Sequence, residues 1–228
     1  MATRVFLIRH GATELSAEDR FAGAIDVLLS AEGRRQARLL GERLAHEPMA
    51  AVYASPMKRT TDTATLIAEP HRKSVEPVDA LREISHGRWE GMRRADVERD
   101  FAEEYGRWDN DPYTFAPAGG ESGLAVTARA LPALLELVLR HSDQQFAVVS
   151  HKATIRLVLS TLLGFDPRRY RDRLDQSPAA LNILDFKRVD QARLTLFNDV
   201  AHYSLNEAHL PEVPHGRLSK VWGEGGHE

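Results

Sequence analysis

Three short apolar runs of this sequence each end in a group of basic residues. The runs are Val5–Ile8, Ala50–Ala54 and Phe146–Val149, followed by Arg9-His10-Gly11, by Ser55-Pro56-Met57-Lys58-Arg59-Thr60 and by Ser150-His151-Lys152-Ala153-Thr154. Parallel strands with these sequences would meet at one edge of a sheet, where open α/β sheets bind their ligands. Arginine forks match phosphate oxygens, and helix starts offer free N–H groups. The pattern therefore predicts a pocket for a dianionic phosphoryl group.

Each of these residues also has a plainer interpretation when it is taken alone. An Arg9-His10 pair after a strand is most often a surface or capping feature. Arg59 could be a solvated helix residue, and a lone His151 is most often a core or loop histidine whose hydrogen bonds are satisfied. The functional interpretation depends on their combination.

The elements that must position these groups alternate between short apolar runs and longer helical patterns. This alternation is typical of a layered α/β domain with a mainly parallel sheet. Ser30 is expected to cap a helix with apolar positions at Ala37, Leu40 and Leu44, and a second helix is expected after Pro56.

The sequence after Met92 predicts three further features, namely a helix, a hairpin and a lid. A helix over Ser122–His141, with an expected kink at Pro132, is predicted to bury one apolar face, composed of Leu124, Ala128, Leu131, Leu135 and Val138. Leu181–Phe186 and Ala192–Phe197 are expected to form a hairpin. The stretch Met92–Gly120 is rich in charged and aromatic residues, and we expect it to be a lid over one end of the sheet.

The composition limits the classes of protein to which this chain can belong. The chain has 228 residues and a mass of 25.5 kDa, which fits one large globular domain. It contains no cysteine, which excludes thiol catalysis, cysteine-ligated zinc and disulfides. A net charge of −3 gives no general attraction to nucleic acid or to an anionic membrane. No stretch reaches the roughly 18 apolar residues of a membrane span, and we expect a cytoplasmic protein.

Six motifs in order resemble the histidine phosphatase superfamily, which has the phosphoglycerate mutase-like fold. They are Arg9-His10-Gly11-Ala12-Thr13-Glu14, Leu29-Ser30-Ala31-Glu32-Gly33, Ser55-Pro56-Met57-Lys58-Arg59-Thr60, the segment from Leu81 to Gly91, Gly119-Gly120-Glu121-Ser122, and Val149-Ser150-His151 with Ile155-Arg156. A single short match would be weak evidence. Six matches in the family's order, spread over residues 9–156, are strong.

The resemblance implies a three-layer α/β sandwich and hydrolysis of a small phosphomonoester through a phosphohistidine. It implies that His10 is the nucleophile, because a neutral imidazole nitrogen can attack phosphorus in line. Arg9, Arg59 and His151 would surround the equatorial oxygens and stabilise their charge. Glu83 would protonate the leaving oxygen and then take a proton from the attacking water. No metal or cofactor is implied, since the Arg and His cluster supplies the positive charge.

Four more positions are expected to contact substrate. They include Gly11, which lets a ligand approach the backbone, and Thr13 of the same motif. The family often has Trp-Asn after this Thr, whereas Leu15-Ser16 stands here, so Ser16 would replace a phosphate-binding Asn only weakly. Lys152 stands where the family usually has Gly. It is either a solvated residue or a contact to a second anionic group of the substrate, and we expect the second.

Two other functions remain as alternatives. A phosphoglycerate mutase typically has a longer insertion and an ERHYG-like run, whereas this chain has Ser85-His86-Gly87 and 27 residues between Gly91 and Gly119. A non-catalytic module could hold a phosphorylated partner in the same pocket. The substrate could be a sugar phosphate, a phosphoglycerate, a nucleotide or a cofactor precursor. We expect one domain over residues 1–210 with a lid at about 92–120, and a tail over 211–228. The oligomeric state stays open, with a homo-oligomer as one alternative.

Overall fold

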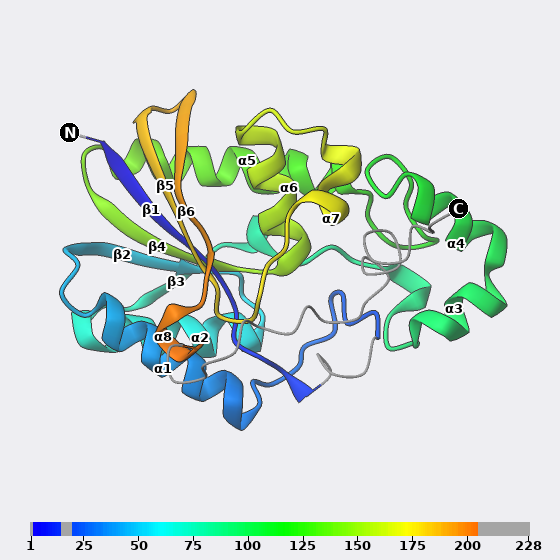
Figure 1. Ribbon diagram of the computed structural model, residues 1–228, viewed down its shortest axis with the longest axis horizontal. Coiled ribbons are helices and arrows are strands. Elements are labelled where there is room, and N and C mark those ends of the chain that lie inside the picture. The colour runs from blue at the N-terminus through cyan, green and yellow to red at the C-terminus, as the bar shows by residue number, and fades with distance from the viewer. Residues whose placement is uncertain (1, 15–19, 205–228) are drawn as a thin grey trace, which may run out of the picture.

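A mixed β-sheet forms the centre of the computed structural model, which describes residues 2–14 and 20–204 (Figure 1). Its described strands are β1 (Thr3–Arg9), β2 (Met49–Ala54), β3 (Val75–Pro77), β4 (Gln145–Ser150), β5 (Leu181–Arg188) and β6 (Gln191–Asp199). The strand order is β3-β2-β4-β1-β5-β6. β3, β2, β4 and β1 run parallel, and β5 and β6 are antiparallel to their neighbours. This confirms the expected α/β class, the mainly parallel sheet and the terminal hairpin.

Helices cover both faces of the sheet and make three layers (Figure 1). On one face lie α1 (Ala31–Leu44) and α2 (Lys58–Ala68), and on the other α5 (Gly123–Arg140) and α6 (Lys152–Leu162). Successive strand residues point to opposite faces. In β1, Val5 and Leu7 therefore join the core beneath α5 and α6, while Phe6 and Ile8 join the core beneath α1 and α2. The three-layer sandwich is thus confirmed.

The start of α1 follows the sequence prediction closely. Ser30 is the N-cap, and its hydroxyl accepts a hydrogen bond from the backbone N–H of Gly33 at 3.0 Å. Ala37, Leu40 and Leu44 are all buried. This cap fixes where α1 begins, directly beside the loop that follows β1.

The buried face of α5 matches the predicted one only in part. Val138 is buried, and Leu131 and Leu135 are half-buried against the core, but Leu124 is 50% exposed and Ala128 is exposed as well. The helix buries seven residues, namely Gly123, Val126, Thr127, Ala130, Leu134, Leu137 and Val138. Apolar residues surround much of this helix, so their spacing alone selected a face rotated partly away from the true one. The helix continues past Pro132 up to Arg140.

The predicted lid folds into α3 (Arg94–Asp100) and α4 (Ala102–Asn110), which lie beyond the ends of the strands (Figure 1). Its buried residues pack with two residues outside the lid in an aromatic cluster that comprises Phe21, Trp89, Val97, Tyr105 and Trp108. The remaining α-helices of the described chain are α7 (Tyr170–Arg173) and α8 (Ala201–Ser204), and short 3₁₀ helices span Glu69–His71, Asp79–Leu81, Gly87–Trp89 and Pro167–Arg169. The predicted tail over 211–228 and the boundary at 210 lie outside the described residues. None of the helices described here is long and apolar enough to span a membrane.

Candidate active site

The ends of β1, β2 and β4 bring the three predicted basic loops together. Arg9 pairs with Ser150 across β1 and β4, and the N–H of His10 donates to the carbonyl of Ser150 at 3.0 Å. On the other side of β4, the N–H of Ser55 donates to the carbonyl of Val149 at 3.0 Å. The loops after all three strands therefore start side by side, as the sequence predicted.

His10 lies buried at the centre of these loops, with 6% of its surface exposed. Its Nδ1 lies 2.8 Å from the carbonyl oxygen of Gly11. Because a carbonyl only accepts, this contact assigns the ring proton to Nδ1 and leaves a lone pair on Nε2. Burial, with the positive charges of Arg9 and Arg59, holds the pKa of His10 well below its usual value. His10 is therefore neutral, which is the form of imidazole that can act as a nucleophile.

His151 faces His10, with the two ring centroids 5.3 Å apart. Nε of Arg59 donates to Nδ1 of His151 at 3.2 Å, and Nε2 of His151 lies 2.8 Å from Oγ of Ser55. Since an arginine Nε can only donate, the proton of a neutral His151 belongs on Nε2. Burial and then the charge of Arg59 hold the pKa of His151 well below its usual value. Ser55 lies in the third sequence motif, but its pairing with His151 was not predicted.

Arg59 is 2% exposed and is held by three hydrogen bonds. Besides the contact with His151, its terminal nitrogens donate to the carbonyls of Ile25 at 2.7 Å and Gly23 at 3.0 Å. A guanidinium has five N–H donors, so two donors of this fork remain beyond those contacts. Burial lowers the pKa of Arg59, and the nearby carboxylate of Glu83 opposes that lowering. Arg59 is thus fixed beside both histidines.

Arg9 carries a second buried positive charge. Its Nη1 donates to the carbonyl of Gln176 at 2.5 Å, while its Nε is buried without a hydrogen-bond partner in the described part of the chain. Burial, followed by repulsion from Arg156, lowers the pKa of Arg9 to about 10. The group still stays charged at neutral pH, and an anion beside it would relieve an unfavourable charge.

Glu83 lies at the N-terminus of α6, the helix that begins directly after His151. One carboxylate oxygen accepts from the N–H of Thr154 at 3.2 Å, and the other from the N–H of Ala153 at 3.2 Å. The single hydroxyl proton of Thr154 is shared between the carbonyl oxygen of Arg82, at 2.8 Å from Oγ1, and Oε1 of Glu83, at 3.2 Å. Glu83 is therefore anchored to the same helix start as His151.

The backbone before Glu83 is held by Arg129 of α5. This guanidinium donates to the carbonyls of Ala80, Arg82 and Glu83 at 2.7–3.2 Å. It also forms two hydrogen bonds with the carboxylate of Glu121, at 2.8 and 2.9 Å. All five N–H donors of Arg129 are used in this clamp. Glu121 thus supports the loop of Glu83, a role that the sequence analysis did not assign.

The loop after His10 lies against the start of α1. A Cβ on Gly11 would lie 2.4 Å from the carbonyl oxygen of Gly33, and a Cβ on Gly33 would lie 2.0 Å from that of Ala12. The N–H of Gly11 donates to Oγ1 of Thr63 at 3.1 Å. Thr13 is buried and forms a β-bridge with Leu29. Ser16 lies outside the described residues.

Lys152 belongs to a charged cluster at the border of the site. Its Nζ lies 3.4 Å from Oδ1 of Asp175, and the same oxygen accepts from Arg156 at 2.8 Å. Arg156 stands within the last sequence motif, but Asp175 lies outside all six. Asp175, like Arg129, therefore carried no signal in the sequence.

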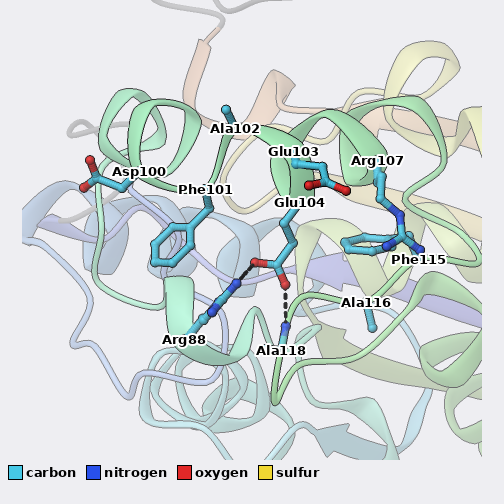
Figure 2. A pocket seen from close by; sticks show the side chains of 10 residues that line it. All are labelled: Arg88, Asp100, Phe101, Ala102, Glu103, Glu104, Arg107, Phe115, Ala116 and Ala118. Atoms are coloured by element: carbon cyan, nitrogen blue, oxygen red, sulfur yellow. Dashed lines mark hydrogen bonds and ion pairs between the residues drawn. The ribbon is translucent and has the colours of Figure 1, made fainter.

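A separate hollow of about 500 Å³ is lined by residues of α3 and α4 and of the segment that follows them (Figure 2). Figure 2 shows Glu104 at its centre, paired with Arg88 and accepting from the N–H of Ala118 at 2.9 Å. None of the predicted site residues lines this hollow. In residues 2–14 and 20–204, no group of three or more His, Asp or Glu side chains could hold a metal ion.

Comparison with known proteins agrees with this geometry. The sequence model of the histidine phosphatase superfamily (branch 1) matches residues 5–200, and the chain belongs to that superfamily. The chain is 36% identical over 167 residues to phosphoserine phosphatase 1 of Hydrogenobacter thermophilus, covering 73% of this chain and 79% of the relative. It is 30% identical over 160 residues to the adenosylcobalamin/alpha-ribazole phosphatase of Salmonella typhimurium, covering 70% and 79%.

The solved structures include a mycobacterial glucosyl-3-phosphoglycerate phosphatase. It superposes with a TM-score of 0.78 and 28% identity, covering 87% of this chain and 99% of that one. The fold is thus phosphoglycerate mutase-like, and the protein is a phosphomonoesterase.

Proposed function

We propose that this protein hydrolyses a small phosphomonoester through a phosphohistidine formed at Nε2 of His10. The proposal rests on the protonation and the hydrogen bonding of the His10 ring. Its Nδ1 is held by the carbonyl of Gly11, its pKa is lowered by burial, and its Nε2 keeps a free lone pair. The printed names of the relatives, a phosphoserine phosphatase and an alpha-ribazole phosphatase, support a small phosphorylated metabolite as the substrate.

In the first step, Nε2 of His10 attacks the phosphorus in line with the ester oxygen. The N–P bond forms, the P–O bond of the ester breaks, and Glu83 in its acid form gives a proton to the leaving oxygen. Arg9 and Arg59 bring two fixed positive charges to the phosphoryl oxygens. His151 contributes as a neutral neighbour whose orientation is set by Arg59.

In the second step, water attacks the phosphohistidine. Glu83 takes a proton from this water, the new P–O bond forms, the N–P bond breaks and neutral His10 is restored. Gly11 and Thr13 line the same loop and are proposed to contact the phosphoryl group, as is Ser16. The expected cytoplasmic location, the absence of nucleic-acid partners and a homo-oligomeric state stay predictions.

Trapping the intermediate tests this proposal. The protein is mixed with p-nitrophenyl phosphate, quenched within milliseconds, and its intact mass is measured. A gain of one phosphoryl group is expected, labile in acid and stable in base as a phosphoramidate is. His10→Ala should lose both the adduct and turnover, whereas His46→Ala, at an exposed histidine, should keep both. An adduct that survives acid would contradict the assignment of the nucleophile.

The same experiment separates the two alternative functions. A phosphoglycerate mutase would keep its phosphoenzyme from water and return the phosphoryl group to added phosphoglycerate. A non-catalytic binding module would form no adduct and release no phosphate. Release of inorganic phosphate in step with decay of the adduct is the outcome expected of the phosphatase.

A further inference from the structure

Two side chains of opposite charge, Lys152 and Asp175, lie at the solvent-exposed border of the candidate site. Lys152 follows His151 directly, and Asp175 precedes Gln176, whose carbonyl binds Arg9. The side chains of Lys152 and Asp175 are 41% and 52% exposed, and Nζ lies 3.4 Å from Oδ1. The pair is therefore next to the proposed phosphoryl site and accessible to a ligand held there.

The contacts of Asp175 are all on one side of its carboxylate. Oδ1 receives Arg156 at 2.8 Å, the N–H of Gln176 at 2.8 Å and Lys152 at 3.4 Å. Within the described part of the chain, Oδ2 forms no hydrogen bond. The carboxylate is thus fixed in place while one of its oxygens stays available to a donor.

The charges around Lys152 favour a further anion. Burial, followed by repulsion from Arg156 and Arg9, lowers the pKa of Lys152 to about 8. Two carboxylates, Asp175 and the nearby Glu83, face these three cations and compensate their charge only in part. Burial opposes ionisation of Asp175, but Lys152 and Arg156 outweigh it and lower its pKa. Both members of the pair are therefore charged at neutral pH.

We propose that Lys152 and Asp175 together select a phosphomonoester that carries both a carboxylate and an ammonium group, such as a phosphorylated α-amino acid. Lys152 binds the carboxylate and Oδ2 of Asp175 binds the ammonium. These two groups of an amino acid share one carbon, so they require adjacent opposite charges, which this pair supplies. The inference rests on the proposed phosphatase function of the same site.

Four substrates, which carry both, one or neither of the two charged groups, separate the effect of the carboxylate contact from that of the ammonium contact. Phosphoserine carries both groups, 3-phosphoglycerate only the carboxylate, phosphoethanolamine only the ammonium, and glycerol 3-phosphate neither. We expect kcat/KM to be highest for phosphoserine. Each added contact is a charge-assisted hydrogen bond at a half-exposed position, which predicts about a tenfold effect on kcat/KM.

Two variants assign each contact to its residue. Lys152→Met should lower kcat/KM about tenfold more for the two substrates with a carboxylate than for the other two. Asp175→Asn should do the same for the two substrates with an ammonium. Lys187→Met and Asp190→Asn are the matched controls. They change exposed residues at the end of the sheet opposite to the site and should alter none of the four values.

Equilibrium binding completes the test. In the His10→Ala background the esters stay intact, so calorimetry measures their dissociation constants without turnover. In this background we expect Lys152→Met to weaken the binding of the two esters with a carboxylate, and Asp175→Asn to weaken that of the two esters with an ammonium group. Equal losses for all four esters in either variant would overturn the inference, because the pair would then act only by positioning Arg9. Selective binding without turnover in the native protein would instead contradict the proposed phosphatase function.

Discussion

Nε of Arg59 donates a hydrogen bond to Nδ1 of His151, and this contact determines which nitrogen of the histidine ring carries a proton. The ring then presents Nε2–H to Ser55. His10 has the opposite arrangement, with its proton on Nδ1 and a lone pair on Nε2. The two buried histidines are therefore both neutral but chemically distinct, and of the two only His10 keeps a lone pair on Nε2, as the proposed nucleophile requires.

Glu83 should be separable from Glu90 by the chemistry of the leaving group. Glu83→Gln should lower kcat for an alkyl phosphate by roughly 10²–10⁴-fold but affect an aryl phosphate far less, because a phenolate leaves with little need of a proton. Glu90 instead accepts from the N–H groups of Ala24 and His86, and Glu90→Gln should show no such selectivity. Steady-state kinetics on both esters measure the ratio. If Glu83→Gln lowers kcat equally for both esters, Glu83 acts as a positioning residue and not as the proton donor.

Removal of metal ions should leave the rate unchanged. Arg9 and Arg59 bring two buried positive charges to the site, which is the charge that magnesium provides in other phosphoryl transfer sites. Kinetics before and after EDTA, with and without added magnesium, test this expectation. Vanadate, which mimics five-coordinate phosphorus, should inhibit strongly. A rate that vanishes with EDTA and returns with magnesium would refute this account of the charge.

Gly33→Ala should damage both stability and the site. The new Cβ would lie 2.0 Å from the carbonyl oxygen of Ala12, so α1 or the loop after His10 must move. We expect a loss of about 3 kcal/mol in the free energy of unfolding, with a matching fall in kcat. Gly106→Ala is the control. It lies in α4 with open space around its Cα, and it should stabilise the protein by about 1 kcal/mol.

His86 should make folding stability depend on pH. Burial, followed by the charges of Arg94 and Arg171, lowers its pKa to about 3. The unfolded chain binds this proton near pH 6.5, so the contribution to stability is complete above that pH and is lost as the pH falls toward 3. Its buried Nδ1 also has no hydrogen-bond partner within residues 2–14 and 20–204.

His86→Phe should therefore stabilise the protein, and more at pH 5 than at pH 7.5. The phenyl ring suits the aromatic surroundings of Phe21 and Trp108 and cannot take up a proton. Urea unfolding at the two pH values measures the difference in the free energy of unfolding. Wild-type pH dependence in the variant would show that His86 does not contribute to it.

The parts of the site that the sequence predicted are those carried by continuous motifs. His10 and His151 each follow a strand directly, and Arg59 lies in the first turn of α2 after β2, so the pairing of β1, β2 and β4 brings them together. Asp175 could not be predicted in this way, because it follows no strand and meets Lys152 only after α6 and α7 have folded against each other. The face of α5 was predicted only in part because its apolar residues fit more than one helical stripe.

The clamp made by Arg129 has a consequence for the order of folding. Its contacts with Ala80, Arg82 and Glu83 join residues 46 to 49 positions apart. Closing such loops costs chain entropy before any contact compensates for it, so local helices form earlier than this clamp does. A refolding chain should accordingly regain helical circular dichroism before it regains phosphatase activity, and Arg129→Met should lengthen the interval between the two.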